Sequence, residues 1–435
     1  TENNQLRSSQ LTPSVGTLGV ILPEKTEYRM NFELSNKERE YLGLEKVKPN
    51  WDKVILKGDT YREPSILYFE DNTIKKHIIS STTQYVEYQY DELTKNREII
   101  LPKTTKGKEQ KLTASILSTK TPIGVYFALN NFGYLLIGNH TTKTTFYSSY
   151  WEDKKQKPEN KMDFWVDDFI KNSDETHIEQ INAFKNAKKK NVKYKSGDFF
   201  AYKIDRKNYG FGRILLDINK LKKNNLIEKN HGLNLLMGTP VLVKLYPFIS
   251  TEKKIDIKIL ENLTALPSDF MMDNHFHYGE YEIIGHKKLD ENEFEYPMSY
   301  GKSISYGSSN IFLQWGFIHK ELPISKFNKY VSGENKFLPE NSTSRYMQNP
   351  YGYYSCGFST HYWKNDIVET IKNNNIFDFN REPYYKTEYD LRNPKNSALR
   401  KEIMTEFGLD ANMSYVENCK KTETEETVKI LEKLK

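Results

Sequence analysis

Residues 197–216, with the sequence GDFFAYKIDRKNYGFGRILL, constrain the fold of this chain more than any other stretch. Two apolar and aromatic runs, residues 199–204 and 209–216, flank a polar tetrapeptide at residues 205–208. Two such runs around a short polar turn are typical of a β-hairpin. We therefore expect a pair of antiparallel strands here, joined by a tight turn.

The second of these strands contains two glycines. Gly210 and Gly212 lie on either side of Phe211. Glycine inside a strand usually marks a bulge or a place where another part of the chain approaches closely. Arg213 then follows a distorted point of the strand, and we expect it to form a structural ion pair rather than a binding contact.

The hairpin resembles the opening of the immunity protein 26 family of bacterial polymorphic toxin systems. Domains of that family begin with a strand of the form K-x-G-D-hydrophobic, here residues 195–199, and continue with G-hydrophobic-G-R-hydrophobic, here residues 210–214. Residues 279–285 resemble a later strand of the family with the form W/Y-x-I-I-G. The resemblance covers residues 191–323.

This resemblance implies a bacterial immunity protein that is not an enzyme, needs no cofactor and binds a cognate toxin domain. Such a protein neutralises the toxin by blocking its active site or its substrate groove. Proteins of this type usually act in the cytoplasm, although a periplasmic or surface site stays open because the chain begins at Thr1 without a methionine. The matching motif residues, which we expect to be structural, are Gly197, Asp198, Gly210, Gly212, Arg213 and Gly285.

The length of 435 residues exceeds that of one ordinary core, so we expect two or three domains. The chain is 37% hydrophobic and 13% aromatic, which suits β-rich domains and argues against a disordered chain. The expected class is α+β and β-rich, with antiparallel sheets. We expect a loose N-terminus at 1–15, an antiparallel β domain of unknown family at 16–152, a helical linker at 153–190, an immunity-protein-like domain with a small twisted antiparallel sheet at 191–325, and an aromatic loop region with C-terminal helices at 326–435.

Alternating and apolar runs predict the strands within these regions. In the N-terminal domain we expect strands at 17–22, 53–56, 65–69, 85–90, 98–101, 112–117, 124–129, 134–137 and 144–147, and a short helix at 36–42 capped by Ser35 and ended by Gly43. In the central domain we expect further strands at 239–246, 255–259, 281–284 and 310–318. Helices are expected in the linker and at 365–373, 398–407 and 424–435.

The charge of the chain is nearly balanced. The 64 basic and 58 acidic residues give a formal net charge of +6. The clearest basic run, residues 185–195, is either a solvated linker or a contact for nucleic acid. No stretch approaches the roughly 18 consecutive apolar residues that a membrane span needs. Cys356 and Cys419 are the two cysteines, which excludes a disulfide framework but leaves one bridge open.

Acidic residues gather in the later part of the central domain. An inhibitor of a basic, nucleic-acid-cutting toxin can present carboxylates in place of phosphates, so this segment is our candidate partner-binding surface. A solvated strand and turn is the alternative. The candidate residues, interrupted by Lys287 and Lys288, are Glu280, Glu282, Asp290, Glu291, Glu293 and Glu295.

Three other groups of residues suggest chemistry less strongly. Asp273, His275 and His277 would approach a metal-binding pattern if they lay on a strand, where alternate side chains share a face. Cys356 and His361 are close in sequence, but no nucleophile elbow, P-loop or dinucleotide-binding motif occurs. The aromatic stretch at 346–363 is either core packing or a contact surface.

Three functions therefore stay open from the sequence. The first is a toxin-binding immunity protein, which rests on the family resemblance. The second is a nucleic-acid-binding or processing protein, supported by the positive charge, the basic run and the many aromatic residues available for stacking. The third is a metal-dependent hydrolase at the histidines.

Overall fold

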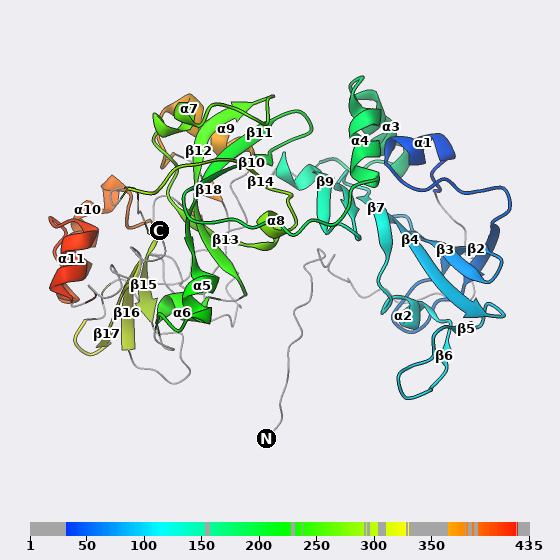
Figure 1. Cartoon of the computed structure of the whole chain (residues 1–435), viewed down its shortest axis with the longest axis horizontal. Helices are drawn as coiled ribbons and strands as arrows, with labels where there is room; N and C mark the ends of the chain where they lie inside the picture. The colour runs from blue at the N-terminus through cyan, green and yellow to red at the C-terminus, as the bar shows by residue number, and fades with distance from the viewer. Residues whose placement is uncertain are drawn as a thin grey trace.

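The computed structural model describes residues 32–152, 157–227, 231–236, 238–290, 293, 296–302, 310–327, 329, 364–378, 380–381, 385–386, 390–422 and 424. Figure 1 shows two lobes side by side. The N-terminal lobe comprises residues 32–185, and the C-terminal lobe comprises the described residues from 196 onward. Every strand pair in the described chain is antiparallel, and helices cover the sheets, so the fold is α+β and β-rich as predicted.

One large sheet forms the body of the N-terminal lobe. Its short extension from β4 consists of β5 (Ile99–Ile100) and β6 (Gln110–Lys111). The order across the main sheet is β1 (Asp52–Leu56), β2 (Ser65–Glu70), β3 (Thr73–Ser80), β4 (Gln84–Lys95), β7 (Ile123–Asn130), β8 (Leu135–Asn139) and β9 (Thr144–Ser148). Strands follow their sequence order across the sheet, which is a meander of hairpin-like connections.

Three helices cover one face of this sheet (Figure 1): α1 (Asn36–Tyr41), α3 (Met162–Lys171) and α4 (His177–Lys185). Val166 and Ile181 are fully buried in the same core as the sheet residues. The apolar stripes of α3 and α4 therefore complete the N-terminal core, in addition to linking it to the next lobe.

The start of α1 is fixed as predicted. The Ser35 hydroxyl accepts a hydrogen bond from the backbone N–H of Glu38, and the Glu38 carboxylate accepts one from the N–H of Ser35. This reciprocal pair is a capping box, which satisfies two otherwise unpaired donors. Gly43 follows the helix with a φ of +71°, a conformation that glycine adopts without strain.

The predicted strand at 112–117 is wrong. Its second half forms the helix α2 (Ala114–Leu117), because the Thr113 hydroxyl accepts a hydrogen bond from the N–H of Ile116 and so caps a helical turn. Ala114 and Leu117 bury themselves against the second face of the sheet. The side-chain cap outweighed the weak strand tendency of a short apolar run.

A five-stranded sheet organises the C-terminal lobe. Its order is β13 (Asp269–Met272), β12 (Pro240–Ser250), β11 (Tyr209–Asp217), β10 (Asp198–Lys203) and β14 (Glu282–His286). The helices around it are α5 (Ile218–Lys223), α6 (Gly232–Leu235), α7 (Ile257–Glu261), α8 (Asn274–His277) and α9 (Lys364–Asn373). Ile367 of α9 is fully buried in the core of this sheet.

The predicted strand at 255–259 is also wrong, since this segment leads into α7. The Asp256 carboxylate accepts a hydrogen bond from the N–H of Lys258 and so caps the helix. The helix then buries Leu260 beneath the five-stranded sheet.

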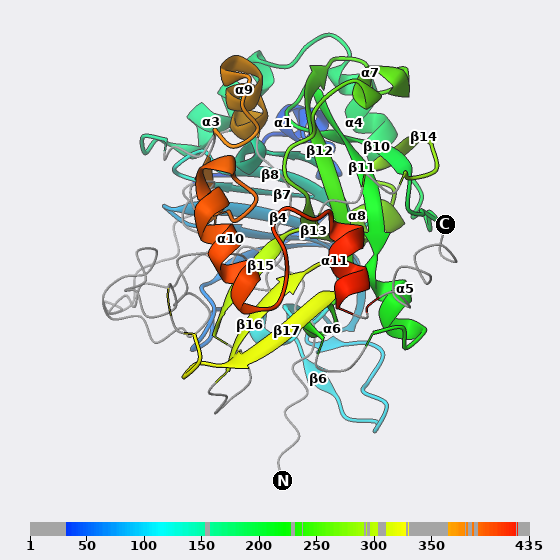
Figure 2. The same cartoon turned by 90° about the vertical axis from the view of Figure 1, so that its left-hand side faces the viewer.

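A smaller sheet, β15 (Met298–Lys302), β16 (Asn310–Trp315) and β17 (Ile318–Pro323), completes this lobe. The helices α10 (Ser397–Glu406) and α11 (Tyr415–Lys421) pack on it (Figure 2). The single strand predicted at 310–318 is a hairpin instead, because Gly316 adopts a φ of +58° and turns the chain.

Some predicted segments, including part of the C-terminal tail, lie outside the described residues. The strands β18 (Asn380–Arg381) and β19 (Tyr385–Lys386) form a small hairpin. The strand predicted at 17–22, the aromatic stretch at 346–363 with Cys356, and most of the helix predicted at 424–435 fall outside the description. Cys419 is a buried free thiol. No helix among the described residues has the length and apolar character needed to span a bilayer.

Candidate functional site

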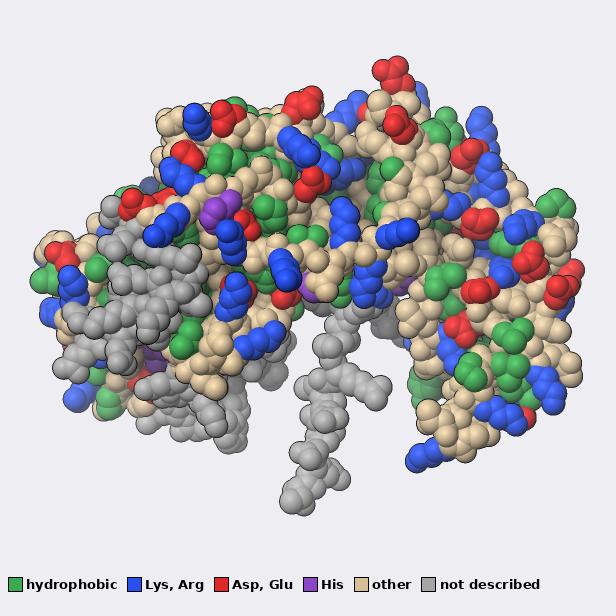
Figure 3. All heavy atoms as spheres, in the orientation of Figure 1, with side chains coloured by type: hydrophobic (Ala, Val, Ile, Leu, Met, Phe, Trp, Pro, Cys, Tyr) green, Lys and Arg blue, Asp and Glu red, His purple; other side chains and the backbone are tan. Residues whose placement is uncertain are grey.

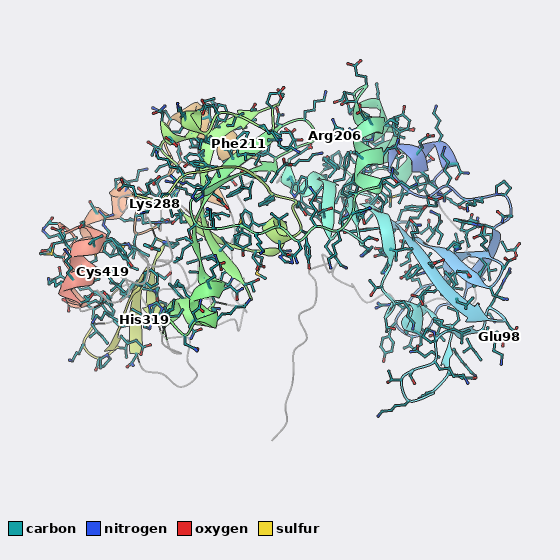
Figure 4. All side chains as sticks on the ribbon, viewed as in Figure 1. Glu98, Arg206, Phe211, Lys288, His319 and Cys419 are labelled. Carbon is teal, nitrogen blue, oxygen red and sulfur yellow. The ribbon has the colours of Figure 1, made fainter. Side chains whose placement is uncertain are left out.

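The hairpin of β10 and β11 is present, and its glycines have a packing role. Gly210 pairs with Tyr202 and Gly212 with Phe200 across the two strands. A Cβ atom at Gly212 would lie 2.4 Å from Cζ of Phe200, and one at Gly210 would lie 2.6 Å from Cζ of Tyr202. The two rings therefore lie across bare backbone. The predicted bulge is present in the pairing of β11 with β12, between Gly210 and Phe211. Figure 4 labels Phe211.

Gly197 and Asp198 fasten the start of β10 to the end of β14. Gly197 has a φ of +90°, and a Cβ atom there would lie 2.4 Å from the carbonyl oxygen of Lys287. The Asp198 carboxylate accepts a hydrogen bond from the N–H of Lys195, and its Oδ1 lies 2.7 Å from Nδ1 of His286. The motif glycine and aspartate thus set the junction of two neighbouring strands.

Arg213 is buried, with 1% of its side chain exposed, and holds the chain that follows β14. Its guanidinium donates to the carbonyl of Lys287 at 2.7 Å and forms an ion pair with Glu293. The same group lies 4.5 Å from the centre of the Phe199 ring. The structural ion pair expected for Arg213 is present.

Gly285 completes the motif residues, because a Cβ atom there would lie 2.7 Å from Cγ2 of Ile257 at the start of α7. All six positions therefore sit at close contacts within one sheet and its margins. The motif that carries the family resemblance encodes the packing of this fold.

The acidic candidate residues do not form one free surface. The Glu280 carboxylate, 12% exposed, accepts a hydrogen bond from the N–H of Thr145 in the N-terminal lobe at 3.1 Å. Glu282 forms an ion pair with Lys253 at 2.6 Å. Glu293 forms an ion pair with Arg213. Three of the six acidic candidate residues therefore have partners within the chain.

The remaining three acidic residues are only partly described. Asp290 is exposed, and its backbone N–H donates to the Glu293 carboxylate at 2.7 Å. Glu291 and Glu295 lie outside the described residues. A partner-binding role for the acidic segment stays a prediction.

The metal-site hypothesis loses its geometric basis. Residues 274–277 form the helix α8 rather than a strand, and side chains two apart on a helix do not face each other. His275 stacks on Tyr281 with ring centres 4.8 Å apart, and Asp273 accepts a hydrogen bond from the Thr239 hydroxyl at 2.5 Å. In the described part of the chain, no group of three or more His, Cys, Asp and Glu side chains is placed to hold a metal ion.

The contact between the lobes centres on Arg206, in the turn of the β10–β11 hairpin (Figure 4). Its guanidinium donates to the carbonyl of Phe169 at 2.8 Å and to the hydroxyl of Ser173 at 2.5 Å, and it lies 3.9 Å from the centre of the Phe169 ring. The sequence predicted residues 205–208 as the polar turn of a hairpin, and this prediction gave Arg206 no contact of its own. The only available signal was an arginine at the tip of a hairpin.

His177 and Lys203 line the same junction. The His177 ring donates from Nε2 to the carbonyl of Tyr41 at 2.7 Å, which leaves Nδ1 to face Arg206 at 3.4 Å. The ammonium of Lys203 lies 4.3 Å from the centre of the Phe146 ring. Burial, with the nearby charges of Lys253 and Arg206, lowers the pKa of Lys203 to about 8. The seam between the lobes thus places two cations, Lys203 and Arg206, beside the rings of Phe146 and Phe169.

No curated protein and no solved structure matches this chain. The family match covers less than half of the chain and runs from the first residue of the β10 motif to the start of β16. The central region, residues 195–310, matches the model of the immunity protein 26 family, as its hairpin motif predicted.

Proposed function

We propose that the protein is a non-enzymatic immunity protein, which binds a cognate toxin domain and blocks its active site or substrate groove. The match of residues 195–310 to a family of immunity proteins carries this proposal. These residues include all five strands of the central sheet, so the similarity covers the whole sheet. We place its action in the cytoplasm on the same resemblance.

The contacts of the motif residues support a binding role over catalysis. Asp198, a motif residue, forms with His286 a pair that has the geometry of an acid and a base. The His286 side chain is 39% exposed, but within the described residues no hydroxyl or thiol is hydrogen-bonded to its other ring nitrogen. The contact between Asp198 and His286 joins β10 to β14, so it has a structural role.

A standard protein interface suffices for the proposed mechanism. Such interfaces bury about 1,600 Å² in total, and tight inhibition comes mainly from slow dissociation. The two lobes, joined by Arg206 and Glu280, would present a pre-formed surface to the toxin, which reduces the entropy lost on binding.

Co-expression with the toxin domain encoded beside this gene tests the proposal. The full chain should restore growth to cells that produce the toxin domain, and the two proteins should co-purify. A toxin domain from an unrelated system serves as the control and should neither be neutralised nor co-purify. Failure of the full chain to bind the neighbouring toxin domain at micromolar concentration would overturn the proposal.

A further inference from the structure

The basic segment, which we define as residues 188–195, differs from the acidic candidate residues in its ion pairing. Lys185, just before it, is paired with Glu45 at 3.0 Å. The lysines within it are exposed, and none of their ammonium groups has a carboxylate of the described residues within ion-pairing distance. These lysines are Lys188, Lys189, Lys190, Lys193 and Lys195.

The basic segment is held in place rather than hanging free. The N–H of Val192 donates to the carbonyl of His277 at 2.8 Å. The Tyr194 ring packs on Phe276 with centres 5.3 Å apart. The stem of Lys190 and the side chain of Val192 lie against Gly279, where a Cβ atom would be 2.9 Å from Cδ of Lys190. Five positive charges are therefore presented from an ordered backbone.

The basic segment lies between the two lobes, so a partner that contacts both lobes can also reach its lysines. It connects α4 of the N-terminal lobe with β10 of the C-terminal lobe. Figure 3 shows Lys and Arg side chains gathered across the middle of one face, where the lobes meet. The nearby Glu280 turns to Thr145, so it does not neutralise this face by pairing with the lysines.

We propose that the basic segment is a docking surface for an acidic face of the toxin domain. This inference rests on the proposed function and reverses the charge first expected for the partner. Unpaired lysines of one sign attract an oppositely charged protein and speed its association. A protein partner fits better than nucleic acid for two reasons. Every cation of the basic segment is a lysine, whereas arginine binds phosphate with two parallel hydrogen bonds. Tyr194 also packs on Phe276 and donates a hydrogen bond to Asp273, so its ring is not available to stack on bases.

The test compares two charge-reversal variants of the full chain. In the first, the five lysines of the basic segment become glutamate. In the matched control, five exposed lysines of the N-terminal lobe that have no ion pair become glutamate, so both variants carry the same net charge. The control positions are Lys37, Lys57, Lys106, Lys108 and Lys111.

The readouts are the association rate with the purified toxin domain at several salt concentrations and growth rescue in cells. We expect the first variant to associate about ten-fold more slowly or worse at low salt, with a weaker salt dependence, while the control keeps most of the wild-type rate. Circular dichroism checks that both variants stay folded.

The outcomes separate the two proposals. If wild type binds the toxin domain and both variants bind equally well, the docking surface is overturned while the immunity function stands. If wild type does not bind at all, both are overturned. If the first variant loses binding to a generic oligonucleotide but keeps wild-type toxin binding, the segment is a nucleic-acid surface and the inference is overturned.

Discussion

The two lobes are both antiparallel sheets covered by helices, yet they fix their strands by different physical means. The N-terminal lobe places a charged network inside its core. The five-stranded sheet of the C-terminal lobe fixes its hairpin by shape, with the rings of Phe200 and Tyr202 lying over glycines. Packing by shape requires glycines and aromatic residues at fixed spacings, so it leaves a recognisable motif in the sequence. The charged network leaves charges that are scattered along the sequence and form no motif.

The internal network of the N-terminal lobe centres on Glu87, whose side chain is fully buried. Its carboxylate accepts a hydrogen bond from Nε of Arg39 at 3.0 Å and one from the Tyr85 hydroxyl at 2.6 Å, and it forms an ion pair with Lys76. Burial acts to raise the pKa of Glu87, but Lys76 and Arg39 outweigh it and keep this pKa below its usual value. One carboxylate thus ties β3, β4 and α1 together.

The sharpest test of this comparison removes that charge. Glu87→Gln should lower the free energy of unfolding by about 3–5 kcal/mol, because buried Lys76 loses its ion-pair partner and Arg39 keeps only its pair with Glu33. Urea denaturation measures the loss. Glu40→Gln, which breaks an exposed pair with Lys46, is the control and should cost less than about 1 kcal/mol. Equal effects of the two changes would show that the buried network does not determine the stability of this lobe.

A second test addresses the packing by shape in the C-terminal lobe. Gly212→Ala should destabilise the protein by about 1–3 kcal/mol, since the new methyl group collides with Phe200 and Leu245. Adding Phe200→Leu to this variant should recover part of the loss, because a smaller side chain makes room for the methyl group. Denaturation of the single and double variants measures the coupling. Strictly additive losses would contradict the packing role of the glycine.

The seam between the lobes should show a smaller, pH-dependent effect. The folded protein releases the Lys203 proton near pH 8, whereas the unfolded chain keeps it up to the ordinary value of 10.5. Between these values the unfolded state binds more protons, so stability contributed by this group rises with pH. Lys203→Met should therefore be more stable than wild type at pH 7, by roughly 1 kcal/mol once solvent screening is considered, and the difference should shrink between pH 8 and 10. A constant difference across this range, measured by urea titration, would rule out the proposed ionisation.

The same contrast explains how far sequence reasoning reached. The β10–β11 hairpin, its bulge and α1 with its caps were all predictable, because local residues determine them. The strand β3 was missed, since Lys76 and His77 interrupt its apolar pattern; both are buried, Lys76 because its charge is met by Glu87. That partner lies on the next strand, and a pattern search along one strand does not reveal it.

The candidate site was less predictable than the fold. The motif residues were identified and lie together, but the acidic candidates separate, because Glu280, Glu282 and Glu293 find partners on other elements. Arg206 was not recognised, since its partners Phe169 and Ser173 lie 37 and 33 residues earlier in the chain. Charge runs in a sequence show where ions occur, whereas pairing depends on the fold.

The basic segment has one more consequence, which concerns the lifetime of the protein. Among the described residues, it is the segment by which the chain passes from one lobe to the other, and its exposed lysines are the residues after which trypsin-like proteases cut. A cut there would leave the lobes joined only by contacts such as those of Arg206 and Glu280. A bound toxin that covers the segment would shield these bonds. Occupancy by the partner would then decide how long the intact chain survives, and unbound molecules would be degraded first.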